Sequence, residues 1–480
     1  MDIKNKINQI LSKMTLKEKI GQLMLFGFGG MDEQGVPKTE FIEDQIEKGL
    51  VGTIIQPLGD YSDTIYNLQK IAVEKSRLKI PLLINADLIH GMDTIFPIPL
   101  AAACSFDVDL VEKSARAAAF EASSCGIHYT NAPMIDVSRD PRWGRIAESQ
   151  GEDPYLSGEM AKAYVRGFQN SDQYVMATLK HYAAYGASEG GRDYDIVEVS
   201  ENVMRNTYLI PFREGVKEGV DSVMTSFNSI EGIPSTGNVK YLRNILRGEF
   251  GFEGIVISDA MSIVEMIAHG YCENTRECAY RAIKAGVDIE LGNDCYSVEL
   301  ERLVLDGVIQ ESEVDEAVTR VLEKKFKLGL FDDPYKYHKF NKNCIFSKEH
   351  LEISEQLAIE SCVLLENNGI LPLNKQKKLS IIGKYGNNKE LGGCWQYSKR
   401  IGDTVTIKDG IEKMGFNIVS IEESYELDKV IKSCSNADAI IFTIGEDQYE
   451  SGEAHSKHIL DLPLKFSFPI SNLATESPAF

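Results

Sequence analysis

GIVISD, at residues 254–259, is a run of apolar residues that ends in an acidic one, as expected of a β-strand buried on both faces. The sequence on either side repeats this form, and segments with helical periodicity, such as 156–170 and 274–286, lie between the runs. The eight runs occupy residues 21–28, 51–56, 81–87, 128–136, 175–181, 222–228, 254–259 and 286–291.

Eight alternations of strand and helix are typical of a TIM-type (β/α)8 barrel, and we predict this α/β fold for residues 1–335. A doubly wound open sheet is the competing architecture. The number of units, and the polar residues that end so many of the runs, favour the barrel.

A second α/β unit is predicted after the barrel. Residues 336–349 form a polar stretch dotted with aromatic residues, which indicates a linker. A helix is predicted over 347–367 and strands follow it, so we interpret residues 350–463 as a partial α/β sandwich domain. The predicted strands lie at 379–386, 415–420 and 437–446.

The last residues do not fit this second unit. Residues 464–480 have neither helical nor strand periodicity, and Pro469 and Pro478 interrupt them. Three strands are also few for a layer that stands by itself. We therefore interpret the second domain as incomplete and the tail as atypical, with a truncated or frame-shifted product as the leading explanation.

Bulk properties limit the function classes. The formal net charge of −21 argues against nucleic acid and anionic membranes as partners. No apolar run approaches the length of a membrane span, and the charged segment 1–14 lacks the apolar core of a secretion signal. The nine cysteines are scattered without a CxxC motif, which favours reduced, mostly buried thiols. These features predict a cytoplasmic protein and leave a homo-oligomer open.

Polar residues at the ends of the predicted strands form the candidate site, because barrels carry their active sites at the C-terminal ends of the strands. Carboxylates outnumber cations among them, which suits a neutral polyhydroxylated ligand that needs both acceptors and charged donors. A phosphate suits them poorly, since no glycine-rich cradle follows the late strands. The residues are Asp87, Asp136, Lys180, His181, Asn228, Asp259 and Glu290.

Each of these residues also has a structural interpretation. Asp259 taken alone is more often a helix N-cap or a turn residue, and Lys180 with His181 could form a salt-bridged structural pair. The basic segment 139–145 could be a solvated loop, and Glu290 is more simply explained by an ion pair inside the barrel. What favours a site is that all of them are predicted at one end of one barrel.

Neither a catalytic metal nor a cofactor is predicted. His90, Asp87 and His181 come nearest to a ligand set, but the sequence has no HExxH motif and no pair of histidines four residues apart on a plausible site helix. His455 and His458 are three residues apart, in a polar loop rather than in a ligand cage.

Motifs in a fixed order identify a family resemblance. The segment APMIDVSRDPRWGRIAESQGEDPYL at 132–156 is very similar to the strand-four loop of glycoside hydrolase family 3, the β-glucosidase-type enzymes. The resemblance extends from about residue 14 to residue 463. The other segments that resemble the family are MTLKEKIGQL (14–23), ADLIHG (86–91), KHYAAYGASEGGRDY (180–194), SVMTSFNSIEGIP (222–234), GIVISDA (254–260), ESCVLLENNGILPL (360–373) and GEDQYESGEAHSKHILDLP (445–463).

The resemblance implies a retaining, exo-acting β-glycosidase that releases terminal β-linked glucose by double displacement. Asp259 matches the nucleophile, and Glu453 best matches the general acid/base, with Glu446 and Glu450 as fallback candidates in the same loop. A retaining enzyme needs its two carboxyl groups about 5–5.5 Å apart. The residues that match the first sugar subsite are Asp87, Arg145, Lys180, His181 and Arg192, with Met224 and Phe227 lining it.

The chain also departs from the family's pattern. Ala260 follows the nucleophile where many relatives carry an aromatic residue, and the family's second domain continues beyond the equivalent of residue 463. The KHFPGHG pattern of the N-acetylglucosaminidase branch is missing, which favours Glu453 as acid/base and a plain β-glycoside as substrate. A β-xylosidase and a truncated sugar-binding remnant stay open as alternatives. A family-3 phosphorylase would require a histidine acid/base and gains nothing from Glu453.

Overall fold

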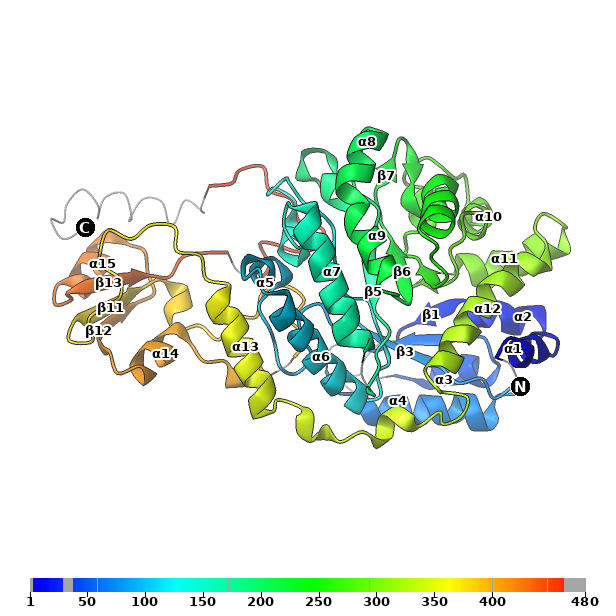
Figure 1. The fold of residues 1–480 in the computed structure, drawn as a ribbon, viewed down its shortest axis with the longest axis horizontal. Helices are drawn as coiled ribbons and strands as arrows, with labels where there is room; N and C mark the ends of the chain where they lie inside the picture. Colours follow the sequence, from blue (N-terminus) through cyan, green and yellow to red (C-terminus); the bar gives the residue numbers. More distant parts are fainter. Residues whose placement is uncertain are drawn as a thin grey trace.

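The computed structural model describes residues 3–28, 38–57, 59–170, 172–292, 294–398, 400–446 and 448–461. Figure 1 shows a large barrel, which holds most of the helices, and a smaller second domain at the left end of the view. The tail predicted at 464–480 lies outside the described residues. The predicted domain boundaries stay predictions.

Parallel strands close into a ring in the first part of the chain. One sheet has the order β10-β1-β2-β3-β4 and another has the order β5-β6-β9. Parallel bridges from Tyr129 to Met176 and from Ile257 to Ile289 join the two sheets at both edges, as a barrel requires. The strands of the ring are β1 Met24–Phe26, β2 Thr53–Ile55, β3 Leu83–Ala86, β4 Tyr129–Thr130, β5 Thr178–Tyr182, β6 Ser222–Thr225, β9 Ile255–Ile257 and β10 Glu290–Leu291.

This ring confirms the predicted fold class, and each of the eight apolar runs overlaps one of its strands. The strands are apolar throughout because both of their faces are covered: helices lie outside and the packed barrel interior lies inside. In β9 and β3 every residue is buried. A short antiparallel hairpin, β7 Ser229–Ile230 with β8 Ile233–Pro234, lies beside the ring.

The barrel helices begin and end at residues suited to those positions. Thr15 and Glu18 form a capping box at the start of α2, and the Asn274 side chain accepts from the Glu277 N–H at the start of α10. Gly286, with a left-handed φ of 96°, ends α10. The helices are α1 Ile3–Leu11, α2 Leu16–Gln22, α3 Glu40–Glu47, α4 Ser62–Lys70, α5 Pro99–Cys104, α6 Val108–Ser124, α7 Pro154–Gln169, α8 Glu201–Val203, α9 Ile210–Lys217, α10 Thr275–Ala285, α11 Cys295–Leu305 and α12 Glu311–Lys327.

The second domain is built on a parallel sheet of three strands in the order β12-β11-β13. Helix α15 packs on one face of this sheet, where Val430 and Ile382 form a small buried cluster. The elements are α13 Lys348–Glu360, β11 Lys378–Ile382, α14 Ile407–Lys413, β12 Asn417–Glu422, α15 Leu427–Cys434 and β13 Ala439–Phe442.

The helix predicted over 347–367 is wrong at its end, because α13 stops at Glu360. Up to that point α13 lies on the barrel: Leu357 is buried, and His350 Nδ1 is 2.8 Å from Glu121 Oε1. Residues 362–371, the apolar stretch, then continue without helix or strand, and Leu365 is 92% exposed. Apolar periodicity without a partner surface does not sustain a helix.

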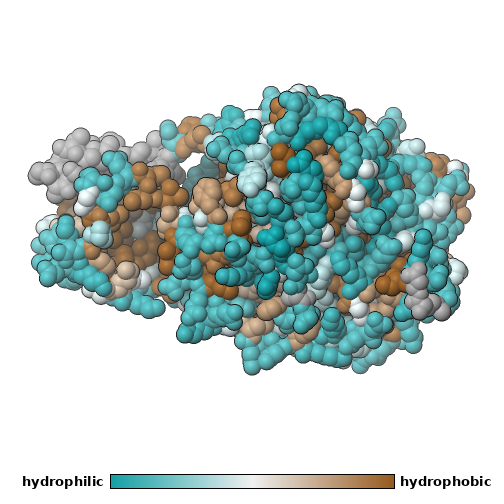
Figure 2. All heavy atoms as spheres, viewed as in Figure 1, coloured by the Kyte–Doolittle hydropathy of each residue, from teal (hydrophilic) through white to brown (hydrophobic). Residues whose placement is uncertain are grey.

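The surface differs between the two parts. Figure 2 shows apolar residues gathered on the second domain at the left of the view, while the barrel presents a mainly hydrophilic face.

All nine cysteines have free thiols. Among the described helices, none combines the length and the apolar character that crossing a membrane requires.

Candidate active site

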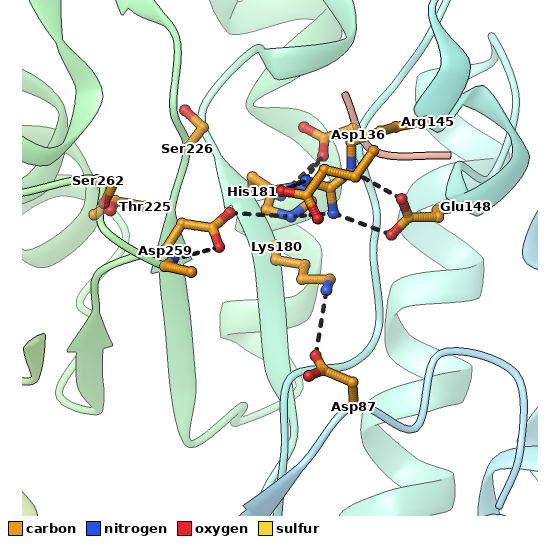
Figure 3. A network of polar contacts seen from close by, with 12 residues as sticks. Asp87, Asp136, Arg145, Glu148, Lys180, His181, Thr225, Ser226, Asp259 and Ser262 are labelled. Atoms are coloured by element: carbon orange, nitrogen blue, oxygen red, sulfur yellow. Dashed lines mark hydrogen bonds and ion pairs between the residues drawn. The ribbon is translucent and has the colours of Figure 1, made fainter. Parts of the chain in front are cut away.

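The C-terminal ends of the barrel strands bring acidic and basic side chains together (Figure 3). Lys180 and His181 lie in β5, Asp87 directly follows β3, and Asp259 follows β9. Because the strands of the ring are parallel, these ends open onto the same face of the barrel. Five of the residues predicted from the strand ends therefore meet here, namely Asp87, Asp136, Lys180, His181 and Asp259. Asn228 instead donates to the carbonyl oxygen of Ala183.

Asp259 presents one carboxylate oxygen without a partner. Its Oδ1 accepts a hydrogen bond from the Ala260 N–H at 2.7 Å, whereas its Oδ2 is buried and has no hydrogen-bond partner among the described residues. Burial raises the pKa of Asp259 to about 7, although the positive charge of Arg145 acts in the opposite direction. The negative charge of Glu453 adds to the rise, and Lys180 opposes it.

His181 is held as a neutral ring beside Asp259. Its Nδ1–H donates to Asp136 Oδ2 at 2.8 Å, and Arg145 Nη2 donates to its Nε2 at 2.9 Å. Burial, and then the charges of Arg145 and Lys180, hold the pKa of His181 well below its usual value. The Nε2 lone pair is thus taken by Arg145, so the contact of 3.4 Å between Nε2 and Asp259 Oδ2 is not an ion pair.

Arg145 lies between two carboxylates, those of Glu148 and Glu453. It lies in a 3-10 turn, Gly144–Glu148, is completely buried, and binds Glu148 through Nε and Nη2 at 2.8 and 3.1 Å. Burial alone would raise the pKa of Glu148, but Arg145 and then Lys180 hold it below its usual value. The third nitrogen, Nη1, makes no hydrogen bond within the described residues and lies 3.6 Å from Glu453 Oε1.

Lys180 and Asp87 form the other side of the site. Lys180 Nζ lies 3.7 Å from Asp87 Oδ1 and 5.6 Å from the ring centre of Trp395, which comes from the second domain. The Lys180 side chain is nearly enclosed, whereas Asp87 is half-buried. The pair therefore offers a donor and an acceptor next to an aromatic face, an arrangement that suits the hydroxyls and the C–H face of a sugar.

Glu453 reaches the barrel site from the second domain. Its Oε1 accepts a hydrogen bond from the Tyr194 hydroxyl at 2.8 Å, and its side chain is 27% exposed. One fallback candidate in this loop, Glu446, instead forms an ion pair with Lys457. The second fallback, Glu450, is half-buried.

Both of the predicted lining residues are buried. Met224 lies in β6, and Phe227 packs in an aromatic cluster with its ring centre 4.7 Å from that of Tyr194. The cluster supports the residues that hold Glu453. It comprises Met134, Trp143, Tyr185 and Phe227, with Tyr194 against its edge.

Arg192 is the one predicted subsite residue that the structure does not bring to the cluster. Its side chain is 58% exposed, and its Nε lies 2.6 Å from Asp195 Oδ2 in the same loop. Glu290 also differs from the prediction that it forms an ion pair inside the barrel. It accepts from the Cys295 and Tyr296 N–H groups at the start of α11, at 3.0 and 2.7 Å, rather than pairing with a cation.

Four further residues contact the site although the sequence analysis did not assign them. Glu148 had a signal, since it follows Arg145 by three residues within the same motif and its carboxylate matches that cation. Tyr194 and Asp193 end the KHYAAYGASEGGRDY segment, but nothing local indicates that they reach the Glu453 loop. Trp395 had no signal, because its place depends on how the second domain sits on the barrel.

No metal centre is found within the described residues, where no group of three or more His, Cys, Asp or Glu side chains is arranged to hold an ion. His90 serves a different purpose. Its two ring nitrogens lie 2.9 Å from the carbonyl oxygens of Phe96 and Cys394, so it connects the barrel to the second domain.

Known proteins resemble both parts of the chain. Residues 15–324 match the Glycosyl hydrolase family 3 N terminal domain, and residues 362–478 match the C-terminal domain of that family. The chain is 35% identical to a periplasmic beta-glucosidase of Salmonella typhimurium, across 95% of this chain and 64% of that protein. It is 30% identical to a putative beta-xylosidase of Formosa agariphila, across 96% of this chain and 64% of that protein.

Solved structures show the same likeness. The beta-glucosidase of Listeria innocua in complex with glucose has a TM-score of 0.90 at 35% identity, covering 97% of this chain and 67% of that one. A mutant of that enzyme in complex with laminaribiose has a TM-score of 0.91 at 35% identity, with the same coverage of both chains. The chain spans 64% of the length of the Salmonella and Formosa relatives. With the family's domain matched over residues 15–324, the chain belongs to glycosyl hydrolase family 3.

Proposed function

We propose that the chain is a retaining, exo-acting β-glucosidase that hydrolyses terminal β-linked glucose from oligosaccharides or glycosides. The observation that carries this proposal is the buried Asp259 Oδ2, which has no hydrogen-bond partner among the described residues. It lies beside a buried arginine, and that arginine also approaches a second carboxyl group, Glu453, on a separate loop. A retaining glycosidase needs this combination of a nucleophilic carboxylate and a separate acid.

In the first step Asp259 Oδ2 attacks the anomeric carbon of the sugar. The glycosidic C–O bond breaks, and Glu453 transfers its proton to the departing oxygen, so the leaving group departs as a neutral alcohol. Positive charge develops on the sugar ring in the transition state. The enclosed carboxylate of Asp259 stabilises that charge more strongly than it would in water.

In the second step Glu453, now ionised, takes a proton from water. The oxygen of that water attacks the anomeric carbon, and the bond to Asp259 breaks. Two inversions at one carbon leave the configuration unchanged. The Tyr194 hydroxyl orients the Glu453 carboxyl for both proton transfers.

The nucleophile is the most direct test. Asp259→Ala in the full chain is expected to reduce hydrolysis of an aryl β-glucoside to background. The wild-type chain, treated with a 2-deoxy-2-fluoro-β-glucoside that carries a good leaving group, should gain the mass of one sugar, and the variant should not. The exposed carboxylate Glu198, replaced by alanine, is the control for loss of a charge. Unchanged turnover of the Asp259→Ala chain would contradict the proposal.

A β-xylosidase is the nearest alternative, and the likeness to the Formosa proteins favours it. The comparison that separates the two is kcat/KM for matched aryl β-glucoside and β-xyloside substrates. We expect the glucoside to be preferred. A preference for the xyloside would keep the mechanism and change the substrate.

A sugar-binding remnant with little activity is the second alternative, favoured by the apolar surface that the second domain leaves exposed. Such a remnant would bind glucose through Asp87 and Lys180 but turn over substrate only when a small nucleophile such as azide is added. Hydrolysis by the full chain without azide would exclude it.

The location of the protein is part of the proposal. The nine free thiols and the acidic charge support a cytoplasmic protein, although the Salmonella relative is named as periplasmic. The domain division at 336–349 is likewise proposed. It is supported by the passage from α12 of the barrel to α13 through short 3-10 turns.

A further inference from the structure

The loop that carries Glu453 pairs with the barrel. Residues 452–457, the acid loop, run antiparallel to barrel residues 142–144, with a bridge between Trp143 and Ser456. In Figure 1 the chain that leaves β13, drawn in red, crosses from the second domain towards the barrel. The backbone hydrogen bonds run from the Gly452 N–H to the Gly144 carbonyl (2.7 Å), from the Gly144 N–H to the His455 carbonyl (3.0 Å) and from the Lys457 N–H to the Arg142 carbonyl (2.8 Å).

The pairing is so close that it requires glycine at position 144. A Cβ atom placed on Gly144 would lie 2.5 Å from the carbonyl oxygens of both Gly452 and His455. A Cβ atom does not approach a backbone carbonyl oxygen that closely, so any other residue at 144 would push the acid loop away. The docking of the acid loop thus explains why residue 144 is a glycine.

Asp193 joins both sides of this pairing with one side chain. Its Oδ2 accepts a hydrogen bond from the Ala454 N–H at 2.7 Å, next to Glu453 in the acid loop. Its Oδ1 accepts from the Trp143 indole N–H at 2.8 Å, on the barrel side. Its own backbone N–H donates to Ser456 Oγ at 2.9 Å. The carboxylate therefore needs both of its oxygens as acceptors.

The backbone on each side of Glu453 is in a conformation that needs support. Gly452 has a φ of 101° and Ala454 a φ of 61°, in the left-handed region that an alanine rarely adopts. The Asp193 bond is made to the N–H of this same Ala454. The next residue, Tyr194, donates to the Glu453 carboxylate, so adjacent residues of one barrel loop hold the backbone and the side chain of the acid.

We propose that Asp193 is a positioning residue that fixes the acid loop on the barrel and thereby sets the place of the Glu453 carboxyl. This inference rests on the proposed function, in which Glu453 is the general acid/base. Both carboxylate oxygens of Asp193 already accept hydrogen bonds from the protein. It acts through the Ala454 N–H and the Trp143 indole.

Asp193→Asn is the most conservative variant. It keeps the shape but replaces one acceptor oxygen by an NH2 group, so either the Ala454 N–H or the Trp143 N–H faces a donor. Glu198→Gln makes the same chemical change at an exposed position further along this barrel loop and is the matched control. Glu453→Ala supplies the reference for complete loss of the acid.

The readout is the dependence of kcat/KM on the leaving group. Phenyl β-glucoside needs protonation of its leaving oxygen, whereas 2,4-dinitrophenyl β-glucoside does not. With phenyl β-glucoside, Glu453→Ala is expected to lose about a hundredfold or more, the usual contribution of a general acid. Asp193→Asn is expected to lose about tenfold to a hundredfold, because misplacing a catalytic group by 1 Å has effects of that size. With the dinitrophenyl substrate, Asp193→Asn should stay within about threefold of the wild type.

The outcomes separate the positioning role from the proposed function. If Glu453→Ala shows the leaving-group dependence and Asp193→Asn behaves like Glu198→Gln, the positioning role is overturned and the proposed function stands. If Glu453→Ala shows no such dependence, the acid/base assignment itself fails. Thermal melting checks that each variant folds. If Asp193→Asn does not fold, Ser456→Ala is the deciding variant, because it removes the acceptor of the Asp193 N–H. A loss of kcat/KM confined to phenyl β-glucoside would support the positioning role. No loss of kcat/KM would overturn it.

Discussion

The barrel and the second domain differ in how completely each buries its apolar surface. In the barrel the ring of strands is joined at both edges, and one continuous cluster of buried side chains fills it. In the second domain, β12 and β13 are edge strands of a three-stranded sheet, and the described cluster centres on Ile382 and Val430. The residues of the apolar stretch 362–371 are all exposed to solvent.

This difference in burial indicates which region positions the side chains of the site. His181 and Arg145 share a hydrogen bond inside the barrel, and Asp136 and Glu148 bind their other nitrogens. Asp259 and Lys180 are buried beside them. The second domain contributes side chains on loops, and the Glu453 loop is itself docked on the barrel. The proposed nucleophile and the proposed acid thus come from two regions but are both positioned by the barrel.

Removal of Arg145 should have the largest effect. Arg145→Ala would leave Glu148 buried without its cation, so we expect the free energy of unfolding to fall by about 3–5 kcal/mol and turnover to be lost. Denaturant titration measures the free energy of unfolding, and hydrolysis of an aryl β-glucoside measures turnover. Arg213→Ala removes a surface pair with Glu214 and should change stability by less than about 1 kcal/mol. Equal losses in the two variants would show that the buried pair in the barrel contributes no more to stability than a surface pair does.

Matched core substitutions should separate the two regions. Ile257 in β9 is completely buried, and Ile257→Ala is expected to lower the free energy of unfolding by about 2–5 kcal/mol. Ile440 in β13 is half-buried, so Ile440→Ala should lower it by about 1 kcal/mol or less. Thermal and chemical unfolding of both variants gives the comparison. A larger loss at Ile440 would show that the second domain is the better packed of the two.

The pH dependence of kcat/KM should follow the ionisation of Asp259 in the barrel. In the proposed mechanism Asp259 attacks only when it is ionised. Burial raises its pKa to about 7, so activity is expected to be lost as the pH falls through that value. We expect kcat/KM to decrease roughly tenfold for each pH unit below about 7. A profile measured between about pH 5 and pH 8 checks this. A value of kcat/KM that stays constant down to about pH 5 would mean that the carboxylate is ionised throughout.

A surface substitution in the apolar stretch should have the smallest effect on stability. Leu365→Ser is expected to stay within about 0.5 kcal/mol of the wild type while it reduces the binding of an apolar dye such as ANS. Leu305, 75% exposed on the barrel, is the matched control, and Leu305→Ser should leave dye binding unchanged. Equal reductions would show that the dye does not distinguish the two regions.

Much of the fold and half of the site could be predicted from local sequence. Apolar runs of strand length marked all eight barrel strands, because a strand covered on both faces must be apolar throughout. The acidic residue after GIVIS was placed correctly at the end of β9, since chain order alone puts it there. The same rule predicted the positions of Asp87, Lys180 and His181.

Other features were decided only by the tertiary structure. Arg192 lies in a predicted motif, yet its side chain turns to Asp195 at the surface, and α13 ends where the barrel no longer covers it. Trp395 and Tyr194 reach the site through contacts between segments far apart in the chain.

Local sequence is enough to specify the barrel and the place of Asp259, because strand period and chain order are local properties. The docking of the Glu453 loop by Asp193 depended on how two distant surfaces meet, and no local pattern records that.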